Sequence, residues 1–280
     1  MKKLFSFLSV VLLTFFSFYY TDRISDYIKD KDPIMMEIID KKTFFETKPV
    51  NAVVEDSYII PGLCGFKVDI DKTYYKMKKL GSYNKNLYTF IPDYPNISIK
   101  DTFDKVIISG NKNKKQVSLV FKIDSSKNVS VILDILKNNN VVGNFFIDGK
   151  YFEDNVDILK DIALDGHFLG NLGYDGKYDK LTIKNTNSLI NRVFLNEHNY
   201  CIEDNLKKAL DICSSLSMYT VKANDIKSLK DIKDNLSNGG IYNINIQSSI
   251  IDEVKIIIKY IKQKGYDVVS LEELISENYY

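Results

Sequence analysis

The stretch VSLVFKIDSS at residues 117–126, followed by VVGNFFIDG at 141–149 and HFLGNLGYDG at 167–176, decides the predicted fold. Each stretch contains a short apolar run typical of a buried β-strand, and polar or glycine residues end that run. Amphipathic helical patterns at 129–137 and 155–164 separate the runs. Strands that alternate with helices through short connections form parallel sheets with right-handed crossovers. The sequence therefore predicts an α/β domain.

The same alternation continues to the end of the chain. We expect further strands at 218–221, 241–246 and 266–270, and further helices at 181–193, 205–215, 251–262 and 271–276. Six or seven such units either close into a barrel or remain an open sheet. In both arrangements the working site lies at the carboxyl ends of the strands. We predict that this domain covers residues 114–280.

The sequence of residues 25–113 predicts a stalk followed by a small α+β module. A helical patch covers residues 34–42. A helix is expected at Asp71–Leu80, with Asp71 as its cap and Gly81 as its stop. Strands are expected at 53–61, 66–70, 87–91 and 105–110. No motif in this module indicates a particular chemistry.

Residues 1–24 predict a membrane anchor. Lys2 and Lys3 precede an uncharged run from Leu4 to Tyr20, which as a helix is roughly 26 Å long, close to the ~30 Å hydrocarbon core of a bilayer. Positive charge before the run predicts that the C-terminal domain lies outside the cell membrane. Because no small-residue cleavage site follows, we predict an uncleaved, single-pass signal anchor. A cleaved signal peptide and a buried core helix are the alternatives.

The composition limits the partners, disulfides and metal sites that we expect. The formal net charge is +1, so a nucleic-acid partner is not expected. The three cysteines, Cys64, Cys201 and Cys213, show no CxxC spacing. Cys201 and Cys213 pair if the fold brings them together, but small core residues are the favoured interpretation for all three. The chain has two histidines, His167 and His198, which limits the available metal chemistry.

Polar and aromatic residues follow the predicted strands and form a candidate cleft. They are Asp124, Asp148, Tyr174, Asp175, Tyr200, Asn245 and Gln247. Carboxylates and amides at such positions also serve as helix caps and turn formers, and this is the commoner role for each of them taken singly. A glycan cleft additionally needs aromatic side chains, for which Tyr151, Phe152 and Tyr178 are further candidates.

The quoted stretches, together with NGGIYNINIQ at 238–247 and IIKYIKQKGYDVVSLEELI at 257–275, resemble the polysaccharide deacetylase (NodB homology) family over about residues 115–277. The resemblance implies a distorted (β/α) barrel. It also implies removal of acetyl groups from polysaccharides by a divalent metal, usually zinc, held by one aspartate and two histidines. In that chemistry the metal activates a water molecule, an aspartate acts as base and a later histidine acts as acid.

The residues that the resemblance assigns to this chemistry are replaced. The two adjacent aspartates of the family correspond to Lys122 and Ile123, and the two histidine ligands correspond to Leu172 and Gly176. No arginine or proline stands near residues 197–200, where the family has its arginine-proline motif. The late histidine would fall near Asn245 or Gln247. We therefore expect no metal cofactor and no deacetylation by the family mechanism.

Three functions follow as hypotheses. The leading one is a catalytically inactive, deacetylase-like envelope protein that binds cell-wall glycan or docks an active envelope enzyme. The second is an active carbohydrate deacetylase with an altered site that uses Asp124, Asp148 and Asp175. The third places the function in the N-terminal module. An aromatic-lined groove would favour glycan binding, and a cleft filled by Leu172 and Ile123 would favour a structural or docking role.

Overall fold

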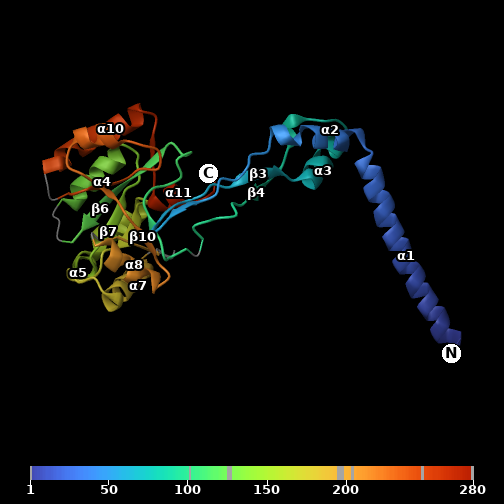
Figure 1. Cartoon of the computed structure of the whole chain (residues 1–280), viewed down its shortest axis with the longest axis horizontal. Coiled ribbons are helices and arrows are strands. Elements are labelled where there is room, and N and C mark those ends of the chain that lie inside the picture. The colour runs from blue at the N-terminus through green and yellow to red at the C-terminus, as the bar shows by residue number, and fades with distance from the viewer. Residues whose placement is uncertain are drawn as a thin grey trace. The chain divides into compact units, whose positions relative to one another are not determined.

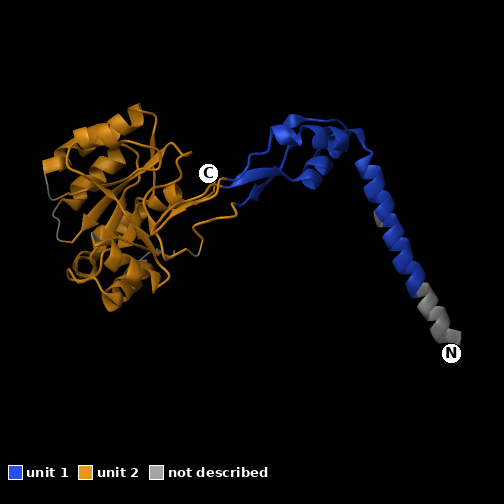
Figure 2. Cartoon of the chain, in the orientation of Figure 1, with its two compact units in different colours: residues 1–49, 64–94 blue, residues 50–63, 95–280 orange. Residues whose placement is uncertain are grey.

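A computed structural model describes residues 2–100, 102–124, 128–193, 199–202, 205–246 and 249–278. The chain divides into two compact units (Figure 2). Unit 1 comprises residues 1–49 and 64–94, and unit 2 comprises residues 50–63 and 95–280. Residues 50–63 and 95–113, which the sequence assigns to the small module, thus cluster with unit 2.

Unit 1 is helical apart from a two-stranded antiparallel sheet. Its elements are α1 (Lys2–Asp30), α2 (Pro33–Lys41), the 3-10 helix η1 (Lys42–Phe44), β3 (Gly65–Val68), α3 (Ile70–Leu80), the 3-10 helix η2 (Lys85–Leu87) and β4 (Phe90–Asp93). Its core consists of Met35, Ile38, Val68, Tyr74, Met77 and Tyr88. Asp32 caps α2 by accepting the Ile34 N–H at 2.9 Å, and it also accepts the Tyr74 hydroxyl.

Helix α1 covers the predicted anchor. Its large apolar side chains between Leu12 and Tyr20 are 51% to 71% exposed. Among the described helices, none combines the length and the apolarity needed to cross a membrane. The anchor at residues 4–20 stays a prediction.

Unit 2 is built on one large sheet (Figure 1). Its strands are β1 (Val53–Glu55), β2 (Tyr58–Ile60), β5 (Val106–Ile107), β6 (Gln116–Ile123), β7 (Asn144–Ile147), β8 (Phe168–Asn171), β9 (Tyr200–Cys201), β10 (Tyr219–Val221), β11 (Asn224–Ile226), β12 (Ile241–Ile244) and β13 (Asp267–Val268). The order is β1-β2-β5-β10-β9-β8-β7-β6-β12-β11, with β13 on β6. All neighbours except β1 and β2 pair in parallel, as the alternation predicts.

Helices connect these strands. They are α4 (Val129–Asn138), α5 (Gly149–Asp154), α6 (Val156–Leu164), α7 (Lys180–Val193), α8 (Leu206–Ser214), α9 (Leu229–Asn235), the 3-10 helix η3 (Ser249–Glu253), α10 (Val254–Gln263) and α11 (Leu271–Ile275). Helices α4 and α10 pack against each other beside β6 (Figure 1). Their apolar stripes explain this position, because each helix turns its buried residues toward the sheet.

Two apolar clusters cover the two faces of this sheet. The outer-face cluster joins Leu119, Phe121 and Ile123 of β6 to the buried sides of α4, α6 and α10. The inner-face cluster joins Val120 of β6 to Phe146, Phe168, Val221 and Ile241, and α11 packs there too. Side chains alternate between faces along a strand, so one long apolar strand serves both clusters.

The alternation of strands and helices is compatible with a closed barrel or an open sheet, and the described residues form an open sheet. In the described part of the chain, the strand order has two ends, β1 and β11, so the sheet stays open. At one end the predicted strand 53–61 is instead a hairpin, in which β1 and β2 pair antiparallel around Asp56 at a φ of 43°. This hairpin places an antiparallel edge strand on the sheet.

Smaller differences have local causes. Helix α3 is capped by Asp69, which accepts the Lys72 N–H at 3.0 Å, so the expected cap Asp71 lies inside the first turn. The predicted strand at 87–91 begins later, at Phe90. Strand β11 and helix α9 were not predicted, because Asn224–Ile226 contains one apolar residue in a polar stretch.

Candidate functional site

A cavity of about 240 Å³ lies at the carboxyl ends of the parallel strands, where the working site is expected. Residues of β6, β10 and β11, the two residues that follow β10, Ile202 after β9 and the first residue of α8 surround it. We call it the strand-end pocket, and its lining consists of Lys122, Ile202, Leu206, Val221, Lys222, Ala223 and Asp225. It therefore combines two ammonium groups and one carboxylate with four apolar side chains.

The alternation along β6 turns Lys122 toward this pocket. Val120 packs in the inner-face cluster, whereas Phe121 and Ile123 pack in the outer-face cluster. Lys122 therefore shares the inner face with Val120. Ile123 is fully buried on the opposite face, beside its strand partner Ile147. The position that the family resemblance gives to a metal-binding aspartate is thus part of the apolar core.

Leu172 and Gly176 occupy the two expected histidine positions after β8. Leu172 is half-buried and packs against the inner-face cluster. Gly176 lies in a tight turn, in which Tyr174 and Lys177 exchange two backbone hydrogen bonds of 3.0 and 2.9 Å. The φ of Gly176 is 67°, a left-handed conformation that favours glycine. Neither residue has a side-chain atom that binds a metal.

The residues at these positions do not fit a zinc ion. Zinc needs thiolate, imidazole or carboxylate ligands. Lys122, Ile123, Leu172 and Gly176 supply none of these groups. Within the described ranges, no cluster of three or more His, Cys, Asp or Glu side chains is arranged to hold a metal ion. The described site thus offers no ligand set for a metal-activated water.

Asp148 is a structural clamp in this fold. The residue is 3% exposed, and its carboxylate caps α5 by accepting the N–H groups of Lys150 at 2.8 Å and Tyr151 at 3.4 Å. It also accepts the N–H groups of Asp175 and Gly176, each at 3.0 Å. Four backbone donors therefore surround a group that the sequence places in a cleft. The cap-and-turn interpretation holds for Asp148.

Two glycines and one threonine allow the start of α5 and the turn after β8 to approach each other closely. The N–H of Gly149 donates to the carbonyl of Gly173 at 2.8 Å, and the Thr186 hydroxyl donates to the same carbonyl at 2.7 Å. A Cβ atom on Gly149 would lie 2.2 Å from Thr186 Oγ1 and 2.5 Å from Tyr174 Cδ2. The close approach of these segments therefore requires glycine at residue 149.

Tyr174 and Asp175 belong to the turn after β8. The Tyr174 hydroxyl donates to Glu153 at 2.6 Å, and this hydrogen bond raises the pKa of the Tyr174 phenol. Asp175 adopts a φ of 52° and is exposed. Both residues shape the turn, and neither belongs to the described lining of the strand-end pocket.

Tyr200 packs in an aromatic row on the inner face. Its ring centroid lies 5.4 Å from that of Phe168 and 5.5 Å from that of Tyr219, and Phe103 extends the row at 4.7 Å from Tyr219. Tyr200 is half-buried there. Its ring contributes to the core of the sheet, and it is not among the described residues that line the strand-end pocket.

The remaining predicted cleft residues are not found in the strand-end pocket as described. Asp124 follows β6 and Asn245 follows β12, and both are exposed. Neither belongs to the described pocket lining. Gln247 and His198 lie outside the described residues. The fold therefore gathers different residues from those predicted, since only Lys122 of the family positions reaches the pocket.

The sequence prediction missed most of the pocket. Ile202 directly follows β9, Leu206 begins α8, and Lys222 directly follows β10. Asp225 lies on β11, which pairs with β12 and places Asp225 opposite Asn243. The amide of Asn243 donates to the Asp225 carboxylate at 2.7 Å. A lysine directly after a predicted strand is the one signal that would have identified Lys222.

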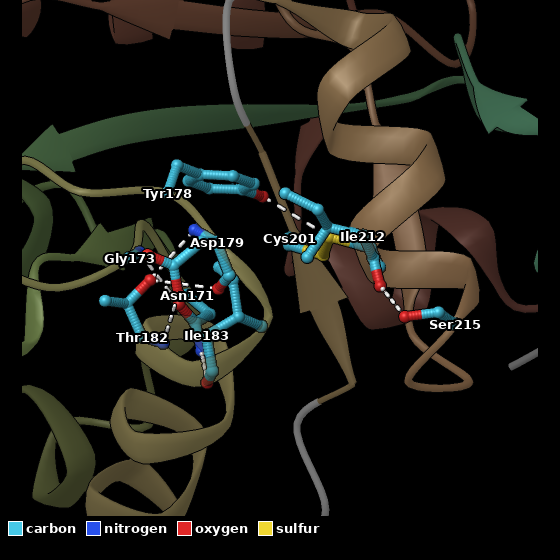
Figure 3. The surroundings of a disulfide bond; sticks show 10 residues. Asn171, Gly173, Tyr178, Asp179, Thr182, Ile183, Cys201, Ile212 and Ser215 are labelled. Carbon is cyan, nitrogen blue, oxygen red and sulfur yellow. Dashed lines mark hydrogen bonds between the residues drawn. A yellow bond between two sulfur atoms is a disulfide. The ribbon is translucent and has the colours of Figure 1, made fainter.

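A disulfide joins β9 to α8 next to this pocket. Cys201 and Cys213 are both fully buried, with their Cα atoms 6.7 Å apart. The expectation that all three cysteines are small core residues is wrong for this pair, because α8 contacts β9 and brings Cys213 beside Cys201. The Tyr178 hydroxyl lies 3.4 Å from Cys213 Sγ (Figure 3). The disulfide pins the segment that carries Ile202 and Leu206.

Comparison with known sequences supports one family. The sequence model described as polysaccharide deacetylase matches residues 109–212. The uncharacterized protein YlxY of Bacillus subtilis (strain 168) is 28% identical over 127 residues, which is 45% of this chain and 40% of that protein. The chain therefore spans 40% of the length of this curated relative.

Solved structures share the fold. A mutant of BA3943, described as a CE4 family pseudoenzyme with restored enzymatic activity, matches with a TM-score of 0.68 at 23% identity, covering 89% of this chain and all of its own. Wild-type BA3943 from Bacillus anthracis gives 0.67 at 23% identity, covering 89% of this chain and 97% of its own. The Bc1960 peptidoglycan N-acetylglucosamine deacetylase matches with a TM-score of 0.54 at 24% identity, covering 61% of this chain and 94% of its own. These likenesses establish an α/β half-barrel of this type.

Proposed function

Because this chain is a degenerate member of the polysaccharide deacetylase family, we propose that unit 2 binds glycan in the strand-end pocket without deacetylating it. One observation carries the proposal. A pocket persists at the strand ends, although Ile123 is buried on the opposite face and Leu172 and Gly176 cannot bind a metal. A domain that served only as a spacer has no need for such a pocket.

The pocket itself favours a small sugar-sized ligand over a flat protein partner. Concave sites with apolar walls and a few polar groups are typical of small-molecule recognition. The related structure Bc1960 is a peptidoglycan N-acetylglucosamine deacetylase, which supports an N-acetylated glycan as the first ligand to test. The predicted aromatic groove is not part of the support, because Tyr200 packs in the sheet core.

An active hydrolase with an altered site has less support. That alternative relies on Asp124, Asp148 and Asp175. Asp148 already accepts four backbone N–H groups and cannot reach the strand-end pocket without breaking them. Docking of an active envelope enzyme remains the competing role for an inactive domain, and the binding experiment below separates it from glycan recognition.

The test compares glycan binding with acetate release. Full-length chain is titrated with N-acetylated chitooligosaccharides, and acetate is measured with and without added zinc. A bulky Ala223→Trp substitution fills the pocket, and Leu164→Trp at a side chain that is 84% exposed is the matched control. We expect saturable binding that Ala223→Trp abolishes and Leu164→Trp preserves, with no acetate above the buffer rate. Stoichiometric zinc in the purified chain would overturn the proposal, and so would acetate release that Ala223→Trp abolishes. Glycan binding that Ala223→Trp leaves unchanged would also overturn it.

We also propose that residues 4–20 hold the chain in the cell membrane with unit 2 outside. Two observations support this. The apolar side chains of α1 between Leu12 and Tyr20 have little cover from the chain itself. The disulfide between Cys201 and Cys213 is typical of proteins in oxidising compartments. Membrane fractions washed at alkaline pH should retain the full chain and release a chain lacking residues 2–20. Recovery of the full chain in the wash would contradict the anchor.

A further inference from the structure

Helix α1 continues beyond the predicted membrane anchor. The anchor ends at Tyr20, whereas α1 runs to Asp30 as one unbroken helix (Figure 1). Residues 21–30 therefore add about 15 Å of helix, and we call them the α1 extension. Charged residues stand at positions 22, 23, 26, 29 and 30. With this many charges, the α1 extension belongs in water rather than in the hydrocarbon of a bilayer.

The large apolar side chains of the α1 extension lie on one face. Ile24, Tyr27 and Ile28 are 56%, 65% and 64% exposed. Their spacing of three and four residues places them next to one another on the helix surface. Asp26 follows Ile24 by two positions and Lys29 follows Tyr27 by two positions, which is roughly half a turn in each case. The α1 extension thus has an apolar face and a polar face.

The polar face holds the α1 extension to unit 1. Lys29 forms an ion pair with Asp71 of α3, and its Nζ atom lies 5.7 Å from the Tyr74 ring centroid and 5.3 Å from the Tyr75 ring centroid. Lys29 is half-buried by these contacts. In a helix of a soluble protein the apolar face normally packs on the body of the protein. Here the contact with α3 uses the opposite face, so the apolar face needs a different cover.

The apolar face continues into the anchor with a regular spacing. The series Leu13, Ser17, Tyr20, Ile24 and Tyr27 advances by four, three, four and three residues, which is the spacing of a coiled-coil seam. All five residues are exposed, and we call them the α1 seam. The small residue within the anchor part, Ser17, permits close approach of a second helix in a membrane.

The position of the α1 seam identifies its partner. Lipid can cover the seam within the anchor but not Ile24 and Tyr27 in water, and a soluble partner can cover only those two. A second α1 helix covers both parts in one register. Two anchors that insert with the same orientation are parallel, so each seam residue faces the same residue of the other copy.

We infer that α1 pairs with α1 of a second copy of this chain, in a parallel helix pair whose contact is the α1 seam. This inference rests on the proposed membrane anchor. Ile24 packs on Ile24 and Tyr27 on Tyr27 of the other copy, which removes apolar surface from water. Lys29 points away from the seam and keeps its ion pair with Asp71.

The experiment places single cysteines in the full-length chain. Ile24→Cys and Tyr27→Cys lie in the α1 seam, and Asp26→Cys is the matched control at an exposed position on the polar face. Isolated membranes are treated with copper phenanthroline, and disulfide-linked dimers are measured on non-reducing gels. The natural chain, in which Cys64 is buried, gives the background. A disulfide needs Cα atoms within about 7 Å of each other, which the parallel pair provides at seam positions and not on the polar face.

A charge in the seam gives a second test. On the Tyr27→Cys chain, Ile24→Asp places two carboxylates against each other in the pair, and Ser25→Asp adds the same charge outside the seam. We expect linked dimer with Ile24→Cys and Tyr27→Cys and only background with Asp26→Cys. Ile24→Asp should abolish the linkage at residue 27, and Ser25→Asp should preserve it.

The outcomes separate the helix pair from the anchor. Equal linkage at all three positions, or linkage at none, in a chain that stays in alkaline-washed membranes would overturn the pair and leave the anchor intact. A different membrane protein on the α1 seam would also give no linkage. Release of the chain into the wash would defeat the anchor, and the linkage pattern measured in the wash would still decide whether the helices pair.

Discussion

Replacing Asp148 with alanine is the sharpest test of how unit 2 is held together. Asp148 is 3% exposed, and its carboxylate joins two segments. It accepts the N–H groups of Lys150 and Tyr151 at the start of α5, and those of Asp175 and Gly176 in the turn after β8. Alanine removes all four acceptor contacts at once. The variant should therefore lose stability, whereas ligand binding in the strand-end pocket should be unchanged.

The magnitude follows from these contacts. Loss of a helix cap costs about 1 kcal/mol. The two bonds to the turn are charge-assisted, and each contributes about 1.5 kcal/mol at the lower end of the range, which applies because Asp175 and Gly176 are exposed and water can replace their partner. The free energy of unfolding should thus fall by about 4 kcal/mol, a large share of the ~5–15 kcal/mol typical of a domain.

The assay is hydrogen exchange at increasing urea, read on peptides from β7 and β8 so that unit 1 does not contribute. Asp179→Ala is the control, because Asp179 caps α7 through the N–H groups of Leu181 and Thr182 from an exposed position. We expect the Asp179 variant to lose less than half as much stability as the Asp148 variant. Equal losses, or an Asp148 variant as stable as the natural chain, would refute the clamp.

Three further predictions concern the same unit. Gly149→Ala should destabilise it by about 1–3 kcal/mol in urea unfolding, because the new Cβ would lie 2.2 Å from Thr186 Oγ1, and a neutral result would show that the segments can separate. His167 has its pKa lowered from the usual 6.5 by burial, so the unfolded chain binds the proton first and stability should fall as the pH drops below about 6.5. His167→Gln should remove that part of the pH dependence, and an unchanged profile would contradict it. Replacing Cys201 and Cys213 with serine should lower the free energy of unfolding by about 3 kcal/mol, because the disulfide limits the entropy of the unfolded chain over a sequence separation of 12. Thermal unfolding of the variant and the natural chain measures this difference, which should vanish under reducing conditions.

The regular part of the fold could be predicted from local pattern. The apolar run of β6 and the amphipathic helices α4 and α10 lie within a few residues of their predicted bounds. Strand β11 could not be predicted, because its partner β12 supplies the hydrogen bonds that its own sequence does not indicate. The hairpin of β1 and β2 was missed because no glycine marks the turn at Asp56.

The candidate site was harder to predict, because the same residue types serve a cleft and a turn. Asp148 follows a buried strand in either case, and only its four backbone partners identify it as a clamp. Cys201 and Cys213 likewise carry no local signal for a bond between them. Contacts between distant segments decide both outcomes.

By itself the sequence determined the alternation of strands and helices in unit 2, and it predicted that Ile123, Leu172 and Gly176 stand where the resembled family has metal ligands. Both properties are local, since apolar periodicity and side-chain chemistry can be read position by position. Only the tertiary structure decided that Ile123 faces the outer core, that Lys122 faces the pocket, and that Lys222 and Asp225 join it there. The physical reason is that the pairing of β6, β10, β11 and β12 sets which side chains meet, and pairing depends on the whole sheet.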